Sequence, residues 1–95
     1  MSEWTKETSS ATVYRWFVAL NGLHIEGARY QDDMWQANVR AGNGGVSVSA
    51  SLGYGATLRD ALRAATENAV TVAQWPAAAV AFQEALDALG GDDDA

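Results

Sequence analysis

The chain has 95 residues, 48% of them hydrophobic, and a formal net charge of -6. This length and composition predict a single domain with one modest core. The sequence contains no cysteine, which excludes disulfides and thiolate metal sites and fits a reducing compartment. Its first residues are polar and mixed in charge, so no signal peptide is expected, and no apolar run is long enough to predict a membrane-spanning helix. We therefore expect a cytoplasmic protein.

The negative charge is concentrated at the end of the chain. Half of it comes from Asp92, Asp93 and Asp94, so residues 92–95 are predicted to be an acidic tail. The nearly neutral remainder argues against a surface that mimics nucleic acid. One lysine and five scattered arginines argue equally against direct nucleic-acid binding.

Residues 1–10 lack hydrophobic periodicity and are predicted to be a mobile arm. Trp4 is the exception there, and we interpret it as a side chain that packs on the edge of the domain. The single domain is expected to cover residues 11–91.

Residues 12–30 predict a β-hairpin, because Asn21-Gly22 lies between β-branched and aromatic runs. A two-residue turn at this dipeptide would place Val18 opposite Ile25. The face predicted to be buried then carries Tyr14, Trp16, Val18, Leu20, Leu23 and Ile25. The outer face carries Val13, Arg15, Phe17, Ala19, His24, Glu26, Ala28 and Tyr30.

The beginning of this segment also fits a helix that stops at Gly22. Its apolar residues at helical spacing are Val13, Trp16, Phe17 and Leu20. That alternative gives the element order α-β-β-β-α-α. We prefer the hairpin because Thr, Val, Tyr, Trp and Phe form strands more readily than helices.

A second dipeptide of the same kind, Asn43-Gly44, predicts a second hairpin over residues 35–52. The apolar pairs on one face would be Ala41 with Val46, Val39 with Val48, Ala37 with Ala50 and Trp35 with Leu52. The polar pairs on the other would be Arg40 with Ser47, Asn38 with Ser49 and Gln36 with Ser51. Such separation is typical of a sheet with one buried and one wet face.

Two helices are predicted after the hairpins. Thr57 caps the first, with Asp60 three residues on, and the helix ends near Trp75. Pro76 begins the second, which Gly90-Gly91 stops after Leu89. The inward side of the first helix is predicted to carry Leu58, Ala61, Leu62, Ala65, Ala69 and Val72. The fold class is therefore α+β: a four-stranded antiparallel meander followed by two C-terminal helices packed on one face.

The sequence offers little for catalysis or metal binding. The single histidine, His24, has no serine placed beside it, and Glu26 and Asp33 are the only mid-chain acids near a sheet face. Asp32-Asp33 and the acidic tail do not make a convincing set of metal ligands. We predict no enzyme activity, no metal and no cofactor.

Recognition is the remaining possibility, and the outer sheet face is the candidate surface. Aromatic and arginine side chains without lysine are typical of protein-binding patches. The predicted partner-binding residues are Arg15, Phe17, His24, Glu26, Tyr30 and Arg40. In the alternative interpretation, the C-terminal helix covers Phe17 and Tyr30.

Two family resemblances concern the start of the first helix. Residues 51–65, SLGYGATLRDALRAA, resemble the strand-to-helix step of HicB-type antitoxins, although Pro76 and a further helix replace the strand that follows in that family. With a helical first segment, the layout resembles a double-stranded RNA-binding domain. Where that family carries basic residues that grip phosphates, this chain has Leu58, Arg59, Asp60 and Ala61. Both resemblances imply a shape and no activity.

The first functional hypothesis is a small non-enzymatic protein, encoded by a phage or mobile element, that binds and inhibits a bacterial defence complex in the manner of anti-CRISPR proteins. Small size, acidity and the outer sheet face motivate it. The alternative is an antitoxin-like or transcription-associated regulatory module that forms a homodimer through the C-terminal helix. A nucleic-acid binder and an enzyme follow in that order.

Overall fold

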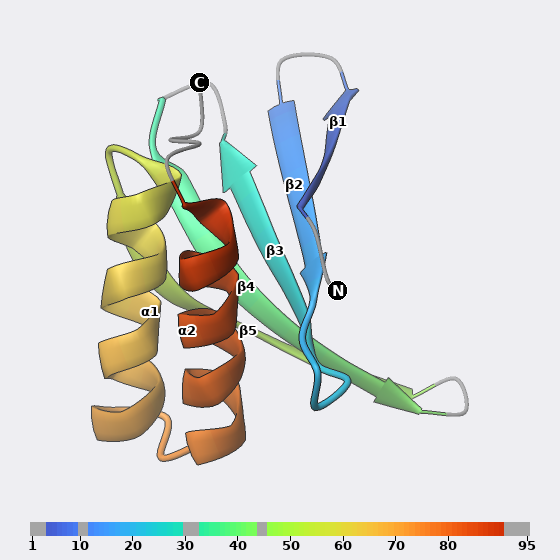
Figure 1. Cartoon of the computed structure of the whole chain (residues 1–95), viewed down its shortest axis with the longest axis vertical. Coiled ribbons are helices and arrows are strands. Elements are labelled where there is room, and N and C mark those ends of the chain that lie inside the picture. The colour runs from blue at the N-terminus through green and yellow to red at the C-terminus, as the bar shows by residue number, and fades with distance from the viewer. Residues whose placement is uncertain (1–3, 10–11, 30–32, 44–45, 91–95) are drawn as a thin grey trace.

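A computed structural model describes residues 4–9, 12–29, 33–43 and 46–90. It shows an antiparallel five-stranded sheet with two helices against one face (Figure 1). The elements are β1 (Thr5–Ser9), β2 (Thr12–Val18), β3 (His24–Arg29), β4 (Trp35–Asn43), β5 (Val46–Gly55), α1 (Leu58–Thr71) and α2 (Pro76–Leu89). Neighbours in sequence are neighbours in the sheet, so the α+β class and the meander are confirmed.

The predicted number of four strands is wrong, because β1 adds a fifth at the edge of the sheet. β1 pairs with β2 from Thr5 opposite Trp16 to Ser9 opposite Thr12, within the segment predicted to be a mobile arm. Its sequence, TKETS, is polar and has no alternating pattern to reveal a strand. The half-buried Trp4 just before it packs against the core, as expected of a side chain on the domain edge.

The β2–β3 hairpin has a different register from the predicted one. Residues 12–18 form a strand, so the helical alternative is wrong. Val18 pairs with His24 rather than with Ile25, and the two strands are joined by five residues instead of two. Within this loop Gly22 has a φ of 86°, and its N–H donates to the carbonyl oxygen of Ala19 at 2.9 Å. The shift of one residue exchanges the two faces of β2 and leaves those of β3 as predicted.

The exchange reverses most of the burial predicted for this hairpin. The β2 residues that enter the core are Val13, Arg15 and Phe17, followed by Ala19. Ile25 is buried as predicted, whereas Tyr14, Trp16 and Val18 lie on the face away from the helices, and Leu20 is exposed in the loop. Apolar side chains occupy both faces of β2, so the hydrophobic pattern alone does not choose the register. The loop itself is held by α2: Asn21 Nδ2 donates to the carbonyl oxygen of Ala77, and the Leu20 N–H donates to Glu84 Oε1, both at 2.9 Å.

The β4–β5 hairpin is also shifted, but by two residues. Ala41 faces Val48 and Val39 faces Ala50. A shift of two keeps the side chains from Ser47 to Ser51 on their predicted faces, so over these residues the predicted division into an apolar and a polar face is correct even though the individual pairs are not. An irregularity between Ala37 and Asn38 then places Ala37 opposite Gly53.

The helices begin as predicted. Thr57 Oγ1 accepts a 3.1 Å hydrogen bond from the backbone N–H of Asp60, and Pro76 starts α2. α1 ends at Thr71, earlier than predicted, and Val72 is 73% exposed rather than inward. Neither helix, within the described residues, is long and apolar enough to cross a membrane.

Glycines of the sheet face α1 and allow the helix to lie close to it. A Cβ on Gly53 would overlap the backbone carbonyl oxygen of Ala61, and one on Gly27 would lie 2.5 Å from Leu58 Cδ1. The small side chains of Ala61 and Ala65, both fully buried, complete this contact. Small residues on both sides therefore fix the distance between α1 and the sheet.

Candidate functional site

The face of the sheet opposite the helices, called here the open face, carries its side chains in three rows that cross β2 to β5. The rows follow from the strand registers. They are Tyr14, Ala28, Gln36 and Tyr54; Trp16, Glu26, Asn38 and Ser51; and Val18, His24, Arg40 and Ser49. Three aromatic side chains and an arginine therefore share a surface with polar residues.

The aromatic part of the open face is built from neighbouring rows. Tyr14 and Trp16 alternate with core residues along β2, so both project from the open face. Their rings stack with centroids 6.2 Å apart and an interplanar angle of 20°. Arg40 reaches across β3, and its guanidinium carbon lies 5.9 Å from the centre of a Trp16 ring. This is a cation–π arrangement in which the arginine holds one side of the indole.

Beside the aromatic pair the open face is polar. Asn38 Nδ2 donates a 2.8 Å hydrogen bond to Glu26 Oε1 on the neighbouring strand. Next to this pair lies a shallow cavity of about 120 Å³. It is lined by Glu26, Asn38, Val39, Arg40, Ser49, Ala50 and Ser51. The volume is small compared with ligand pockets, which are typically about 300–1,000 Å³, and it suits one side chain of a partner.

The structure brings together half of the predicted partner-binding residues. His24 and Arg40 are opposite each other on β3 and β4, and Glu26 is next to them in the adjacent row. Arg15 and Phe17 are 5% and 2% exposed and face the helices, so their predicted place on the outer face is wrong. Tyr30 lies outside the described residues.

The covered position of Phe17 agrees with the alternative that we considered for it. Phe17 belongs to the core cluster that also contains Phe82 and Leu89 of α2, and its ring centroid is 5.5 Å from that of Trp4. Arg15 is in the same region, with its guanidinium carbon 5.6 Å from the Trp4 ring. Both residues therefore contribute to packing inside the domain.

The sequence analysis missed Tyr14, Trp16 and Tyr54 as surface residues. The first two were assigned to the core because a two-residue turn was assumed at Asn21-Gly22. Tyr54, 57% exposed, reaches the open face through the irregularity in the β4–β5 pairing, which leaves it opposite Gln36. A pattern of small residues at Gly53 and Gly55 is the only trace of that irregularity in the sequence.

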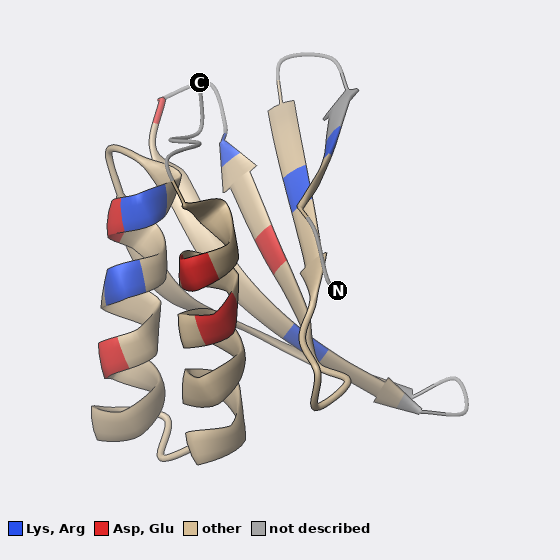
Figure 2. Ribbon diagram, viewed as in Figure 1, with Lys and Arg blue, Asp and Glu red and all other residues tan. Residues whose placement is uncertain are grey.

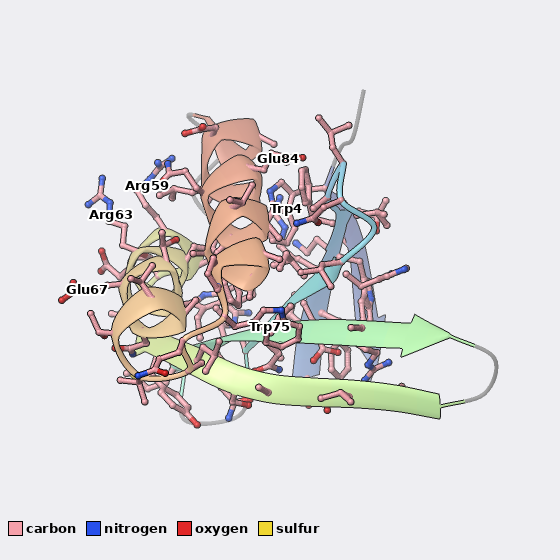
Figure 3. All side chains as sticks on the ribbon, turned by 90° about the horizontal axis from the view of Figure 1, so that it is seen from below. Trp4, Arg59, Arg63, Glu67, Trp75 and Glu84 are labelled. Carbon is pink, nitrogen blue, oxygen red and sulfur yellow. The ribbon has the colours of Figure 1, made fainter. Side chains whose placement is uncertain are left out.

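Charges of both signs are interspersed over the described residues (Figure 2). On α1, Arg59 and Arg63 project away from the sheet (Figure 3). Arg59 also donates a hydrogen bond to the carbonyl oxygen of Gly90, at the end of α2. Neither arginine is therefore placed to extend the open face.

Among the described residues, no group of three or more His, Cys, Asp or Glu side chains is placed to hold a metal ion. No protein-family model, curated protein or solved structure matches the chain. Function is therefore inferred from the open face.

Proposed function

We propose that this protein is a non-enzymatic protein-binding module that holds its partner on the open face. The observation that carries the proposal is the stacked pair of Tyr14 and Trp16 on a sheet face without helices, with Arg40 against the indole. Tryptophan, tyrosine and arginine are enriched among the few residues that supply most of the binding energy in protein interfaces. Stacking and the cation–π contact hold the three side chains in place, so little side-chain entropy remains to be lost on binding.

The surroundings of this aromatic group suit a protein partner. Asn38, Ser49 and Ser51 can exchange hydrogen bonds with a partner at the rim of the contact, as in known interfaces. The cavity of about 120 Å³ beside them fits a single protruding side chain. An aromatic centre with a polar border is the expected anatomy of a moderate-sized, separable interface.

Within this class, inhibition of a bacterial defence complex is the specific role that we propose, in the manner of anti-CRISPR proteins. Its support is the small size of the chain and its net charge of -6, half of which comes from residues 92–94 and can attract a basic surface on a larger assembly.

A second candidate, the homodimeric regulatory module, is favoured by one feature of the helices. A shallow, mainly apolar groove of about 430 Å³ lies along α2, with Thr66 of α1 at its border. Its walls are Thr66, Ala79, Val80, Gln83, Glu84 and Asp87, and Val80 is 57% exposed. An apolar groove along α2 is where a second C-terminal helix could pack.

Affinity capture from the cells that naturally contain the protein, followed by mass spectrometry, tests the first proposal. A partner that binds through the open face should be retained by the wild type and lost with Trp16→Ser and Arg40→Ala. Its dissociation constant, measured with purified components, should rise by about tenfold or more, because hot-spot truncations cost about 2 kcal/mol or more.

Matched changes on the other side of the molecule serve as controls. Val70→Ser and Arg63→Ala alter an exposed apolar residue and an exposed arginine on α1. Both should keep the wild-type affinity. Equal binding by the wild type and the Trp16 and Arg40 variants, with folding verified by circular dichroism, would rule out the open face as the binding site.

A further inference from the structure

The second edge of the sheet, formed by β5, is open over the first half of the strand. β5 is the last strand in the sheet order, so only one of its sides is paired, with β4. Residues 46–51 contain neither a charged residue nor a proline. Of these, Ser47, Val48, Ser49 and Ser51 are exposed, and Val48 retains 59% of its surface. Unpaired backbone groups along such a segment are a template for another strand.

The second half of β5 is covered by α1. Gly53 and Gly55 lie directly beneath the helix, and Asn68 Nδ2 donates a 2.8 Å hydrogen bond to the carbonyl oxygen of Leu52. The first half instead projects with β4 beyond the helices (Figures 1 and 3). The available edge is therefore a short segment that ends at Ser51.

The opposite edge of the sheet is protected in the usual ways. β1 is only five residues long, it carries the exposed charged side chain of Lys6, and Trp4 holds its start against α2. Short length and a lysine are common means by which proteins prevent addition of a further strand. The first half of β5 has neither of these protections.

We propose that residues 47–51 of β5 pair antiparallel with the same residues of a second copy of this chain. With Ser49 on the two-fold axis, Val48 faces Ala50 of the other copy and Ser47 faces Ser51. The apolar pair then lies on the helix side of the sheet and the serines on the open face. Serine pairs opposite each other can exchange hydrogen bonds, and the valine gains an apolar neighbour.

The charge of the chain favours a second copy at this edge over the other surfaces. Two molecules that each carry a net charge of -6 repel each other, so their contact is most favourable where neither contributes a charge. The groove along α2, by contrast, contains Glu84 and Asp87, so a two-fold contact through this groove would bring four carboxylates into one interface. A two-fold contact also places identical surfaces together, which suits a segment that is complementary to itself.

Pairing at β5 does not depend on the proposed partner on the open face. It would, however, join the open faces of two copies into one larger surface. Ser49 and Ser51 line the 120 Å³ cavity. Two cavities and two aromatic groups would therefore lie on one continuous sheet surface.

Light scattering coupled to size-exclusion chromatography, from micromolar to millimolar concentration, tests the pairing. The wild type should reach twice the monomer mass, and Ser49→Lys should raise the dimer dissociation constant by about tenfold or more, because the two lysines meet at the axis. Ser49→Ala is the matched control and should remain dimeric. Val80→Lys, in the groove along α2, should also remain dimeric.

Hydrogen exchange of the wild type gives a second readout that does not require a variant to fold. Amide exchange at residues 47–51 should slow as the protein concentration increases, while exchange in β1 should not change. A wild type that is monomeric throughout, or a dimer that survives Ser49→Lys and dissociates with Val80→Lys, overturns the proposal. Slowed exchange at residues 47–51 only when a captured partner is added would assign this edge to that partner and overturn it as well.

Discussion

The indole Nε1 of Trp4 donates a 2.8 Å hydrogen bond to the carbonyl oxygen of Ala85, which lies 81 residues later in the chain. The Trp4 ring also packs against Phe17, with 5.5 Å between ring centroids. One side chain thus connects the segment before β1 with both β2 and α2. β1 belongs to the folded domain because of this connection as well as its backbone pairing.

Replacing Trp4 should therefore destabilise the whole domain. Trp4→Ala removes the ring contact and the hydrogen bond, and should lower the free energy of unfolding by about 2–3 kcal/mol. Trp4→Phe keeps most of the packing and should cost about 1 kcal/mol. Urea denaturation followed by circular dichroism measures both. If Trp4→Ala matched the wild type, the described contacts of Trp4 would contribute nothing to stability.

The observed register of β2 makes opposite predictions for two adjacent residues. Phe17→Ala opens a cavity in the core and should cost about 3 kcal/mol. Val18→Ala changes a residue that is 46% exposed and should cost about 0.5 kcal/mol or less. Thermal unfolding of the two variants compares them directly. The reverse order would support the register with a two-residue turn at Asn21-Gly22.

The close approach of α1 to the sheet predicts a large effect at Gly53. A Cβ there would meet the backbone of Ala61, which cannot move without displacing the helix, so Gly53→Ala should cost about 3 kcal/mol. At Gly27 the obstacle is the end of the Leu58 side chain, and Gly27→Ala should cost about 1 kcal/mol. Chemical denaturation should show this difference. If Gly53→Ala lost no more stability than Gly27→Ala, α1 would be able to move away from the sheet as easily as the Leu58 side chain changes its position.

The contribution of the Thr57 cap to stability can be distinguished from that of an ordinary threonine hydrogen bond in the same helix. Thr57→Ala removes the acceptor for the Asp60 N–H and should cost about 1 kcal/mol. Thr71→Ala, near the other end of the same helix, removes only a hydrogen bond from the side chain to the carbonyl oxygen of Glu67. Since alanine also has the better helix propensity, this control should leave stability within about 0.5 kcal/mol of the wild type. A similar loss in both variants would contradict the capping role.

The sequence predicted most accurately those elements in which the capping or turn residues and the hydrophobic pattern indicate the same structure. Thr57 and Pro76 located the starts of the two helices, because the first N–H groups of a helix have no acceptor within it. A threonine cap supplies one acceptor, and a proline at the first position has no N–H to satisfy. The β4–β5 hairpin kept its faces despite a shift of two residues, since apolar residues such as Val39 alternate strictly with polar ones such as Asn38.

The errors arose where the deciding contacts are distant in sequence. β2 has Val13 and Phe17 on one face and Trp16 and Val18 on the other, so both registers bury apolar surface. The observed register is accompanied by hydrogen bonds between the β2–β3 loop and α2, which no local sequence pattern reveals. Within the candidate site, His24, Glu26 and Arg40 were placed correctly because β3 and β4 kept their faces, whereas the aromatic residues of β2 were not.

The anchoring of the β2–β3 loop on Ala77 and Glu84 has a consequence for the order of folding. These two contacts join segments 56 and 64 residues apart, so they form only after a large part of the chain has been ordered. A β2–β3 hairpin that forms before α2 docks has only the local contacts of its loop, such as the hydrogen bond from the Gly22 N–H to the carbonyl oxygen of Ala19, to favour the native turn over the tighter one at Asn21-Gly22. We therefore expect the contacts with α2 to stabilise the native pairing late in folding, and a chain synthesised only as far as β5 to populate the hairpin with the two-residue turn more than the full chain does.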